Sequence, residues 1–298
     1  MPEPVTSESI TRAARVLAGA RHIVVFTGAG VSAESGIATF REPETGLWAQ
    51  YDPMDLATRE GFLRDPELVW RWYEHRFGLA AAAEPNPGHR AIARLERLLP
   101  GTTVDTQNSD GLHQRAGSSD VVELHGTMHS FKCLDGRHRG YALADLLRQA
   151  ARPPRCPECG DLMRPDVVWF GEALPDDALR RAQGLAAGCD VMLVAGTSAI
   201  VYPAAGVPLI ALQGGAVLID VNPEPSALSH QATHFLQGRS GDVLPRLVTA
   251  VEATLGARRP DACGDARPQE ARGDPPAPDA AADDASAAAA SATAPADG

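Results

Sequence analysis

Residues 23–41 read Ile-Val-Val-Phe-Thr-Gly-Ala-Gly-Val-Ser-Ala-Glu-Ser-Gly-Ile-Ala-Thr-Phe-Arg. The apolar run predicts a buried strand, and the glycines after it predict a tight turn that leads into a helix. Gly28, Gly30 and Ala33 match the G-x-G-x-x-G/A pattern, whose small residues let the backbone approach a pyrophosphate at a helix N-terminus. A nucleotide cofactor is therefore the first hypothesis, and an ordinary turn between a strand and a helix is the alternative.

A dehydrogenase that transfers hydride fits this stretch less well. After such a fingerprint, an acidic residue should end a second strand about 20 residues further on. The corresponding residues, 47–53, read Leu-Trp-Ala-Gln-Tyr-Asp-Pro and do not resemble a strand. A nicotinamide dehydrogenase is therefore disfavoured.

Composition excludes several classes of protein. The chain has 298 residues and a formal net charge of −11, which argues against nucleic acid as a partner because phosphate contacts need clustered Lys and Arg. No apolar run approaches the ~18 residues of a membrane span, and the polar N-terminus does not resemble a signal peptide. The five cysteines do not suggest a disulfide framework, so we expect a cytoplasmic protein. Residues 257–298 are rich in Ala, Asp and Pro, which predicts a disordered tail.

Apolar runs and helical patterns alternate along the chain. Strands are expected at residues 102–106, 121–124, 191–195 and 216–221, and helices at 9–19, 87–99, 178–187 and 204–212. This alternation predicts an α/β fold with a Rossmann-like, mostly parallel sheet whose ligands lie at the carboxyl ends of the strands. A helix at 65–83 and a cysteine- and arginine-rich stretch of little core character at 129–165 interrupt the pattern. We interpret both as insertions that form a smaller lobe.

Polar side chains follow two of the expected strands. Gln107, Asn108 and Asp110 come after the strand at 102–106, and they could bond a carboxamide or ribose hydroxyls, although a polar loop is the alternative. His125 follows the next strand. A neutral imidazole there could act as a general base, and the alternative is a structural histidine.

Together these motifs resemble the sirtuins, NAD-dependent protein lysine deacylases of bacterial type. The resemblance spans residues 21–245 and rests on matches in family order. These are the segment 28–37 with Phe40 and Arg41, Thr106-Gln107-Asn108 with Asp110 and Leu112-His113, His125-Gly126, Val168-Trp169-Phe170-Gly171-Glu172, Gly196-Thr197-Ser198 and Asn222-Pro223-Glu224.

The resemblance implies a catalytic domain of residues 1–256 in two lobes. The large Rossmann-like lobe would comprise residues 8–40, 86–127 and 166–256, and a zinc-ribbon-like and helical lobe would comprise 41–85 and 128–165. The implied reaction moves the acyl group of a protein lysine onto NAD and gives nicotinamide and O-acyl-ADP-ribose.

The resemblance also implies the residues of the site. His125 would be the base, with Asn108 and Asp110 as further catalytic residues. NAD would be bound by Gly28, Ala29, Gly30, Ser35, Phe40, Arg41, Gln107, Asn108, Asp110, Gly196, Thr197, Ser198, Asn222, Glu224 and Ser240. Ser109 stands where the family usually has Ile or Val, so nicotinamide binding is expected to differ.

The implied partner is an acylated lysine in a peptide that adds as a strand between residues 168–172 and 200–203. The expected contacts are Val168, Phe170, Gly171, Glu172 and Tyr202. Backbone pairing places little demand on sequence, so broad peptide selectivity is expected.

The spacing of Tyr73 and Arg76 bears on the acyl group. Residues at i and i+3 share a helix face, and an Arg with a phenol beside it can hold a carboxylate. An ordinary helix in which Arg76 pairs with a Glu is the alternative. The Tyr-x-x-Arg pattern resembles class III sirtuins, which remove succinyl and malonyl groups, and Ala57 falls where that class keeps a small residue. The resemblance therefore implies activity on acidic acyl groups as well as on acetyl groups.

A zinc site is expected in the second insertion. Cys156-Pro157-Glu158-Cys159 has the spacing of a zinc knuckle, but the usual first pair lacks its second cysteine, because Gly136 stands there. The expected ligands are Cys133, Cys156 and Cys159, with Asp135 or His138 as the fourth. The alternative is a metal-free lobe with three reduced cysteines.

Two other functions remain open from the sequence. One is a protein ADP-ribosyltransferase or NAD glycohydrolase that uses the same pocket. The other is a non-catalytic module that binds NAD or acyl-lysine, against which the presence of His125, Asn108 and Asp110 argues.

Overall fold

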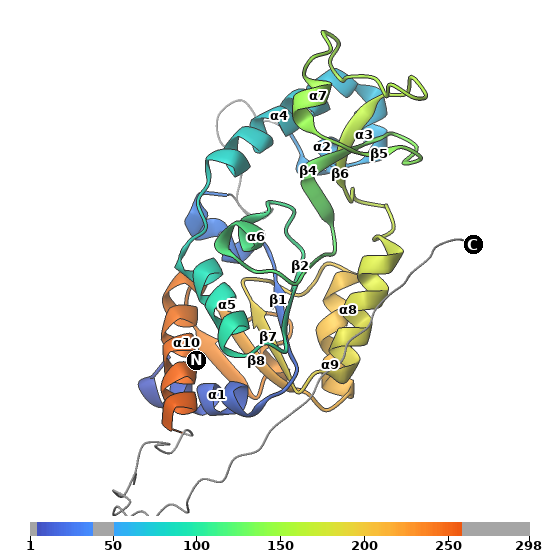
Figure 1. Ribbon diagram of the computed structural model, residues 1–298. Coiled ribbons are helices and arrows are strands. Elements are labelled where there is room, and N and C mark those ends of the chain that lie inside the picture. The colour runs from blue at the N-terminus through green and yellow to red at the C-terminus, as the bar shows by residue number, and fades with distance from the viewer. Residues whose placement is uncertain (1–4, 38–50, 258–298) are drawn as a thin grey trace, which may run out of the picture. The chain divides into compact units, whose positions relative to one another are not determined.

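A computed structural model describes residues 5–37 and 51–257 (Figure 1). The contacts group residues Met1–Arg259 into one compact unit. Residues 258–298 of the tail predicted at 257–298 lie outside the described residues, as do Phe40 and Arg41, and Ala257 is the last residue of a helix. The lobe boundaries expected from the sequence therefore remain a prediction, and the elements are described below by their own bounds.

A six-stranded parallel sheet has the order β3-β2-β1-β7-β8-β9. Its strands are β1 (Ile23–Thr27), β2 (Thr102–Thr106), β3 (Val121–Glu123), β7 (Val191–Ala195), β8 (Val217–Asn222) and β9 (His234–Gln237). This is the doubly wound order of Rossmann folds, in which the chain direction across the sheet reverses between two central strands. Here the reversal falls between β1 and β7. The expected Rossmann-like class is therefore confirmed.

Helices cover both faces of this sheet because alternate side chains of each strand point to opposite sides. On one face, Val25 and Leu193 pack into a core with α1 (Ser7–Gly19), α5 (Pro87–Leu98) and α10 (Ser240–Ala257). On the other face, Val24 and Val194 pack with α8 (Asp176–Gly188) and α9 (Val207–Gln213). The helix expected at 204–212 begins instead as a 3₁₀ turn, Ala204–Gly206, because Pro208 lies in the first turn of α9.

The expected helix after the glycine turn is not seen in the described part of that segment. Two 3₁₀ turns, Ala29–Val31 and Ala33–Ser35, follow β1 instead, and Gly36 ends them in the left-handed conformation with φ 81°. Gly28 has extended backbone angles, so the turn does not depend on a positive φ there. The reason for its small side chain lies in packing, as described below.

A three-stranded antiparallel sheet of order β5-β4-β6 shares a buried apolar cluster with helices from two other parts of the chain. The elements are β4 (Gly126–Cys133), β5 (Arg139–Tyr141), β6 (Met163–Val167), α2 (Pro53–Leu56), α3 (Arg59–Arg64), α4 (Pro66–Ala82) and α7 (Leu143–Leu146). Asp65 caps α4 by accepting from Leu68 N at 3.0 Å, and Pro66 occupies the first turn.

The stretch at 129–165 contributes more core than expected. Phe131, Leu146 and Met163 are buried with Trp70 and Phe77 of α4 in one apolar cluster. The expectation of little core character was wrong because these apolar residues are dispersed among Arg and Cys, so their common face is visible only once β4 pairs with β6. α6 (Leu112–Ala116) completes the helices of the described residues.

Candidate functional site

The loop after β1 lies directly against the loop after β7, at the reversal point of the sheet. Gly28 N donates to Ala195 O at 3.2 Å, and Gly30 N donates to Gly196 O at 2.8 Å. A Cβ at Gly28 would lie 2.7 Å from Thr197 Cβ, and one at Gly30 would lie 2.7 Å from Gly196 O. The glycines therefore let two loops meet at the edge where open α/β sheets bind ligands.

Polar side chains after β2 bond to this glycine loop. Asn108 Nδ2 donates to Ser32 Oγ at 3.0 Å and to Gly28 O at 3.2 Å, and Ser32 Oγ donates to Asp110 Oδ2 at 2.7 Å. Asp110 Oδ1 accepts from Leu112 N at 2.9 Å. All three side chains are buried. The structure thus brings the predicted Asn108 and Asp110 together around a hydroxyl that belongs to the glycine loop.

Gln107 joins the same cluster from the other side. Its Nε2 donates to Thr197 Oγ1 at 2.9 Å and lies 3.3 Å from Thr27 O. Residues Gln107, Thr197 and the glycine loop therefore share one polar surface formed by the ends of β1, β2 and β7.

Two buried histidines support this surface. His89 Nε2 lies 3.4 Å from Ser32 Oγ, and the His89 ring meets the His113 ring edge-to-face with centroids 4.9 Å apart. His113 Nε2 lies 2.9 Å from Thr27 Oγ1, which donates to Thr106 Oγ1 at 2.8 Å. Burial lowers the pKa of His89 to about 4 and that of His113 to about 3, so both rings are neutral near pH 7.

Asn86 and His89 are functional-site neighbours that the sequence motifs do not indicate. They form a capping box at the start of α5, where Asn86 Oδ1 accepts from Gly88 N at 2.9 Å. Asn86 Nδ2 also reaches Val31 O at 2.7 Å and Ser35 Oγ at 3.0 Å in the glycine loop. Asn-Pro-Gly-His was readable as a helix start, but nothing local indicated contact with a loop more than 50 residues away.

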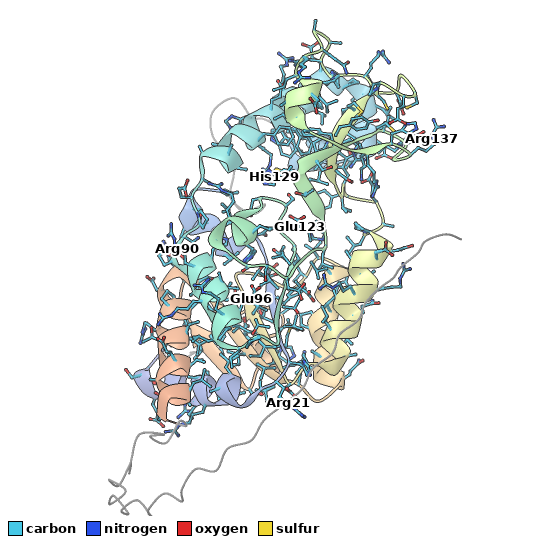
Figure 2. All side chains as sticks on the ribbon, in the orientation of Figure 1. Arg21, Arg90, Glu96, Glu123, His129 and Arg137 are labelled. Carbon is cyan, nitrogen blue, oxygen red and sulfur yellow. The ribbon has the colours of Figure 1, made fainter. Side chains whose placement is uncertain are left out.

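His125 lies at the end of β3, half-buried, and its Nδ1 is 2.9 Å from Gln107 O. A carbonyl oxygen only accepts, so Nδ1 carries the proton and Nε2 holds the lone pair. Burial lowers the pKa of His125 below its usual value, against the opposing effect of this main-chain hydrogen bond. The ring is therefore a neutral base near pH 7. His129, labelled in Figure 2, donates from Nε2 to Asp110 O at 3.0 Å and so ties β4 to the same loop.

The segment after β6, residues 168–172, begins beside His125 and includes an exposed aromatic residue. Val168 N donates to His125 O at 2.9 Å, and Phe170 N donates to Ala57 O at 2.9 Å. Phe170 is 38% exposed and Tyr202 is 68% exposed, although most large apolar side chains are buried. Exposed aromatic residues on the two predicted walls suit a peptide-binding surface.

Glu172 has a different environment from the one expected. Its carboxylate accepts from Trp169 N at 2.9 Å and from Arg164 Nη2 at 3.0 Å, and Arg164 is 1% exposed with Cζ 3.3 Å from the centre of the Trp169 ring. The Arg164 charge helps lower the pKa of Glu172, against the raising effect of burial. This carboxylate therefore orders the wall, and a direct peptide contact by it remains only a prediction.

Ala57, Tyr73 and Trp169 are buried in one apolar cluster behind this wall. Trp169 Nε1 donates to Tyr73 Oη at 2.7 Å, and burial raises the pKa of Tyr73 to about 12. Arg76 is half-buried on the same helix, with Cζ 5.0 Å from the centre of the Trp72 ring. The positive charge of Arg76 lowers the pKa of Tyr73, against the larger effect of burial, so the two residues of the predicted Tyr-x-x-Arg pattern lie close together.

The remaining predicted cofactor residues among those the structure describes lie after β1, at the ends of β7 and β8 or at the start of α10. Asn222 ends β8, is 5% exposed and donates to Asp220. Glu224 is exposed, and Ser198 and Ala29 are half-buried. Ser240 is buried, and its hydroxyl has no hydrogen-bond partner within the described chain. The predicted contacts of Phe40 and Arg41 fall outside the described residues.

The amides and hydroxyls at this edge suit a dinucleotide. Carboxamides such as Gln107, the Ser and Thr hydroxyls and the main-chain groups of the glycine loop are the donors and acceptors that ribose hydroxyls and a nicotinamide amide require. Their position at the reversal point of the sheet agrees with the place where such folds bind nucleotides.

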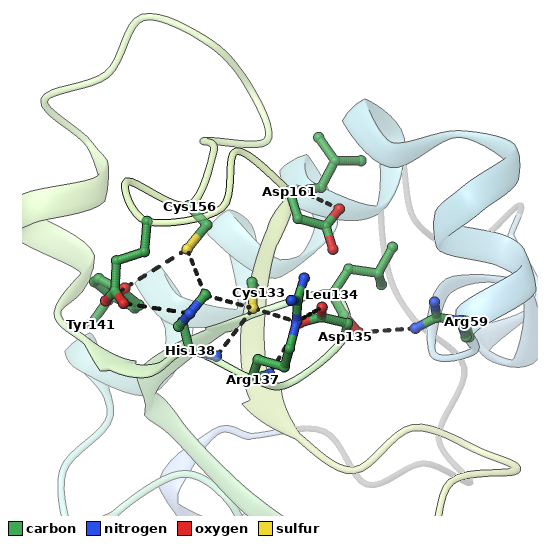
Figure 3. A network of polar contacts seen from close by, with 11 residues as sticks. Arg59, Cys133, Leu134, Asp135, Arg137, His138, Tyr141, Cys156 and Asp161 are labelled. Carbon is green, nitrogen blue, oxygen red and sulfur yellow. Dashed lines mark hydrogen bonds and ion pairs between the residues drawn. The ribbon is translucent and has the colours of Figure 1, made fainter.

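A cluster of candidate metal ligands, called the metal cluster below, lies at the end of β4, and Figure 3 shows three of its members, Cys133, His138 and Cys156. The donor atoms of Cys133, His138, Cys156 and Cys159 lie within 4.8 Å of one another, and Asp135 is not in this set. Three thiolates and one imidazole are a ligand set typical of structural zinc. Of the two fourth ligands left open by the sequence, the geometry favours His138. Asp135 instead lies 2.9 Å from the Cys133 sulfur and pairs with Arg137.

Comparisons with known proteins agree with this arrangement. The profile of the Sir2 family matches residues 28–203. The chain is 54% identical over 246 residues to "NAD-dependent protein deacylase 2" of Pyrobaculum aerophilum, which covers 83% of this chain and 97% of that protein. A solved complex of a Sir2 homolog with NAD superposes with a TM-score of 0.76 at 44% identity, over 82% of this chain and 94% of the other.

A third comparison concerns a Sir2 protein bound to a myristoylated histone peptide. It superposes with a TM-score of 0.68 at 38% identity and covers 85% of this chain and all of the other. Separately, none of the described helices has the length and apolar character needed to cross a bilayer.

Proposed function

The chain belongs to the Sir2 family, and we propose that it is an NAD-dependent protein lysine deacylase that removes acidic acyl groups as well as acetyl groups. The observation that carries the proposal is the meeting of the Asn108–Ser32–Asp110 cluster and the glycine loop at the reversal point of the sheet, with His125 bonded to the main chain of the adjoining Gln107. NAD would supply a ribose carbon that accepts the acyl oxygen, with nicotinamide as the leaving group, and water would then release the free lysine and O-acyl-ADP-ribose.

The residues after β2 would bind and orient the cofactor. Asn108 and Asp110 are held by Ser32 and Leu112 N, so their positions are set before any ligand arrives. Such preorganisation supports catalysis because the polar groups need not reorganise during the reaction. Gln107 retains its Oε1 as an acceptor while Nε2 bonds Thr197.

His125 would act as the general base. Its Nδ1–H is bonded to Gln107 O, so Nε2 is the atom available to take a proton from a ribose hydroxyl. A lowered pKa keeps the ring in the basic form at neutral pH. The second solved relative described above has an acylated histone peptide bound, which supports an acylated protein lysine as the substrate of this chain as well.

Tyr73 and Arg76 support a preference for acyl groups that end in a carboxylate. Ala57, which has only a methyl side chain, is buried in the same apolar cluster as Tyr73, and Phe170 N donates to its carbonyl at the edge of the peptide wall. A guanidinium in a half-buried site binds a carboxylate more strongly than one in open water does. A succinyl or malonyl chain that enters beside Trp169 would place its carboxylate toward Arg76.

One experiment tests the reaction and the acyl preference together. The purified chain is incubated with NAD and peptides that carry acetyl-, malonyl- or succinyl-lysine, and the products are identified by mass spectrometry. Release of nicotinamide and O-acyl-ADP-ribose with each acylated peptide is expected, with the highest kcat/KM for the acidic groups. Nicotinamide release that needs no peptide would indicate an NAD glycohydrolase, and ADP-ribose attached to the peptide would indicate an ADP-ribosyltransferase.

We also propose a cytoplasmic location. Three of the described cysteines gather at a metal cluster, and thiolate ligands are kept available in a reducing compartment.

A further inference from the structure

The metal cluster contains a histidine whose two ring nitrogens face different groups. His138 Nδ1 lies 3.5 Å from Cys156 Sγ and 3.8 Å from Cys133 Sγ, so this nitrogen points into the cluster (Figure 3). The opposite nitrogen, Nε2, lies 3.4 Å from Glu158 Oε2. The ring is therefore located between the thiolates and a carboxylate.

Glu158 is itself held in place. Tyr141 Oη donates to Glu158 Oε1 at 2.5 Å and lies 3.7 Å from Cys156 Sγ. Glu158 also sits between Cys156 and Cys159 in the sequence, so the knuckle that supplies two thiolates fixes its backbone. The side chain of His138 is 26% exposed and that of Glu158 is 60% exposed, which places the contact at the rim of the cluster.

A histidine ligand needs more positioning than a cysteine ligand does. Its metal-binding nitrogen must be deprotonated, and the ring must be turned so that this lone pair faces the metal. A carboxylate that accepts from the other N–H sets the tautomer, fixes the ring and increases the electron density on the ligating nitrogen. A four-cysteine site has no ring to orient, so this requirement arises in this chain from the replacement of one thiolate by an imidazole.

We propose that Glu158 is a positioning residue for the metal site, which holds His138 Nε2–H so that Nδ1 faces the three thiolates. Tyr141 assists by holding the carboxylate. The inference concerns the affinity for zinc alone and does not depend on the acyl preference or on the catalytic role of His125.

The test measures zinc affinity of the full-length protein by competition with a chromogenic zinc chelator. Glu158→Gln should weaken zinc binding by about 10- to 100-fold, the usual effect of removing such a partner. In the His138→Cys background, which restores four thiolates, Glu158→Gln should leave the affinity unchanged. Tyr141→Phe should weaken binding in the same direction as Glu158→Gln, by a smaller factor.

Asp135→Asn is the matched control. Like Glu158→Gln it removes one carboxylate charge close to the cluster, but Asp135 lies beside Cys133 and not beside His138. It should change the affinity less than Glu158→Gln does. Equal losses from Glu158→Gln in both backgrounds would show that only charge matters and would overturn the proposal. A larger loss from Asp135→Asn would also overturn it, because Asp135 would then be the fourth ligand.

Folding does not obscure this test. Glu158 is mostly exposed and its replacement by Gln keeps the shape of the side chain, so the far-ultraviolet circular dichroism should match the parent. Should His138→Cys fail to fold, the zinc affinities of Glu158→Gln, Tyr141→Phe and Asp135→Asn still decide between the explanations. If only charge mattered, Glu158→Gln and Asp135→Asn would lose the same affinity and Tyr141→Phe would lose none.

Discussion

His125 Nδ1 lies 2.9 Å from the main-chain oxygen of Gln107, so the residue proposed as the base takes its tautomer from the residue proposed to bind nicotinamide. The contact joins the end of β3 to the end of β2. It leaves Nε2 as the acceptor and orients the ring through a main-chain group.

Replacing His125 by Ala should reduce kcat/KM for deacylation by about 10²- to 10⁴-fold, the range for loss of a general base. The fold should persist because the ring is only half-buried and its hydrogen bond within the described residues is to the backbone. Steady-state kinetics with an acylated peptide checks this, and His230→Ala, an exposed histidine in a 3₁₀ turn, is the control. Near-normal turnover by a folded His125→Ala protein would refute the role.

Arg76→Met should separate the two kinds of acyl group. Succinyl-lysine turnover should fall by at least 10-fold, since loss of a charge-assisted hydrogen bond of about 1.5–3 kcal/mol corresponds to roughly that factor or more. Acetyl-lysine turnover should be retained because an acetyl group has no carboxylate. Arg71→Met, on the exposed side of the same helix, is the matched control. Equal losses on both substrates would count against a carboxylate-binding role.

Asp105 should make stability depend on pH. It is buried in β2, neither carboxylate oxygen has a hydrogen-bond partner among residues 5–37 and 51–257, and burial raises its pKa to about 7 despite the charge of Arg181. The folded state then binds a proton that the unfolded state has lost between about pH 4 and pH 7, so this group lowers stability as the pH rises through that window.

Asp105→Asn removes this titration. The free energy of unfolding of the variant minus that of the parent should increase by about 2–4 kcal/mol from pH 4.5 to pH 8. The upper figure follows from about 1.36 kcal/mol per pKa unit. Urea unfolding at both pH values measures the difference, with the exposed Asp145→Asn as control. A difference between Asp105→Asn and the parent that is the same at both pH values would contradict the prediction.

Gly30→Ala should disturb the meeting of the two loops. The new Cβ would lie 2.7 Å from Gly196 O, and overpacking of this kind costs about 1–3 kcal/mol. NAD affinity should fall as well, because the loop must move at the proposed cofactor site. Calorimetric titration and thermal unfolding measure both effects. Gly184→Ala in α8, where a Cβ meets nothing within 4 Å, should leave NAD affinity unchanged and raise helix stability slightly.

Removal of zinc should destabilise the protein. Metal bound only by the folded chain stabilises it by about 2.7 kcal/mol when its concentration is 100-fold above Kd. Metal analysis of protein purified without chelator should find one zinc per chain, and a strong chelator should lower the unfolding temperature. His138→Ala should reduce the zinc content, whereas Cys189→Ala, at the end of α8, should not. Protein that contains no zinc when purified in this way would show the metal-free alternative to be correct.

The central strands could be predicted from the sequence with little error. Residues 102–106 and 191–195 were expected as strands and are β2 and β7. Each is a short apolar run ended by turn or polar residues, and these signals are contained within a few residues. β9 (His234–Gln237) and the antiparallel sheet were not predicted, because His234, Lys132 and Arg139 interrupt their apolar pattern.

The sequence by itself determined the doubly wound sheet, the glycine loop, the polar residues after β2 and the spacing of the zinc knuckle. Each of these is encoded by neighbours along the chain, where periodicity and turn chemistry operate over a few residues. Only the tertiary structure decided that His138 and not Asp135 completes the cluster, that Arg164 engages Glu172, and that Asn86 and His89 reach the glycine loop. These contacts join segments that are far apart in the sequence. Which of these segments pack together is set by the burial of apolar side chains in the folded protein, which local patterns do not encode.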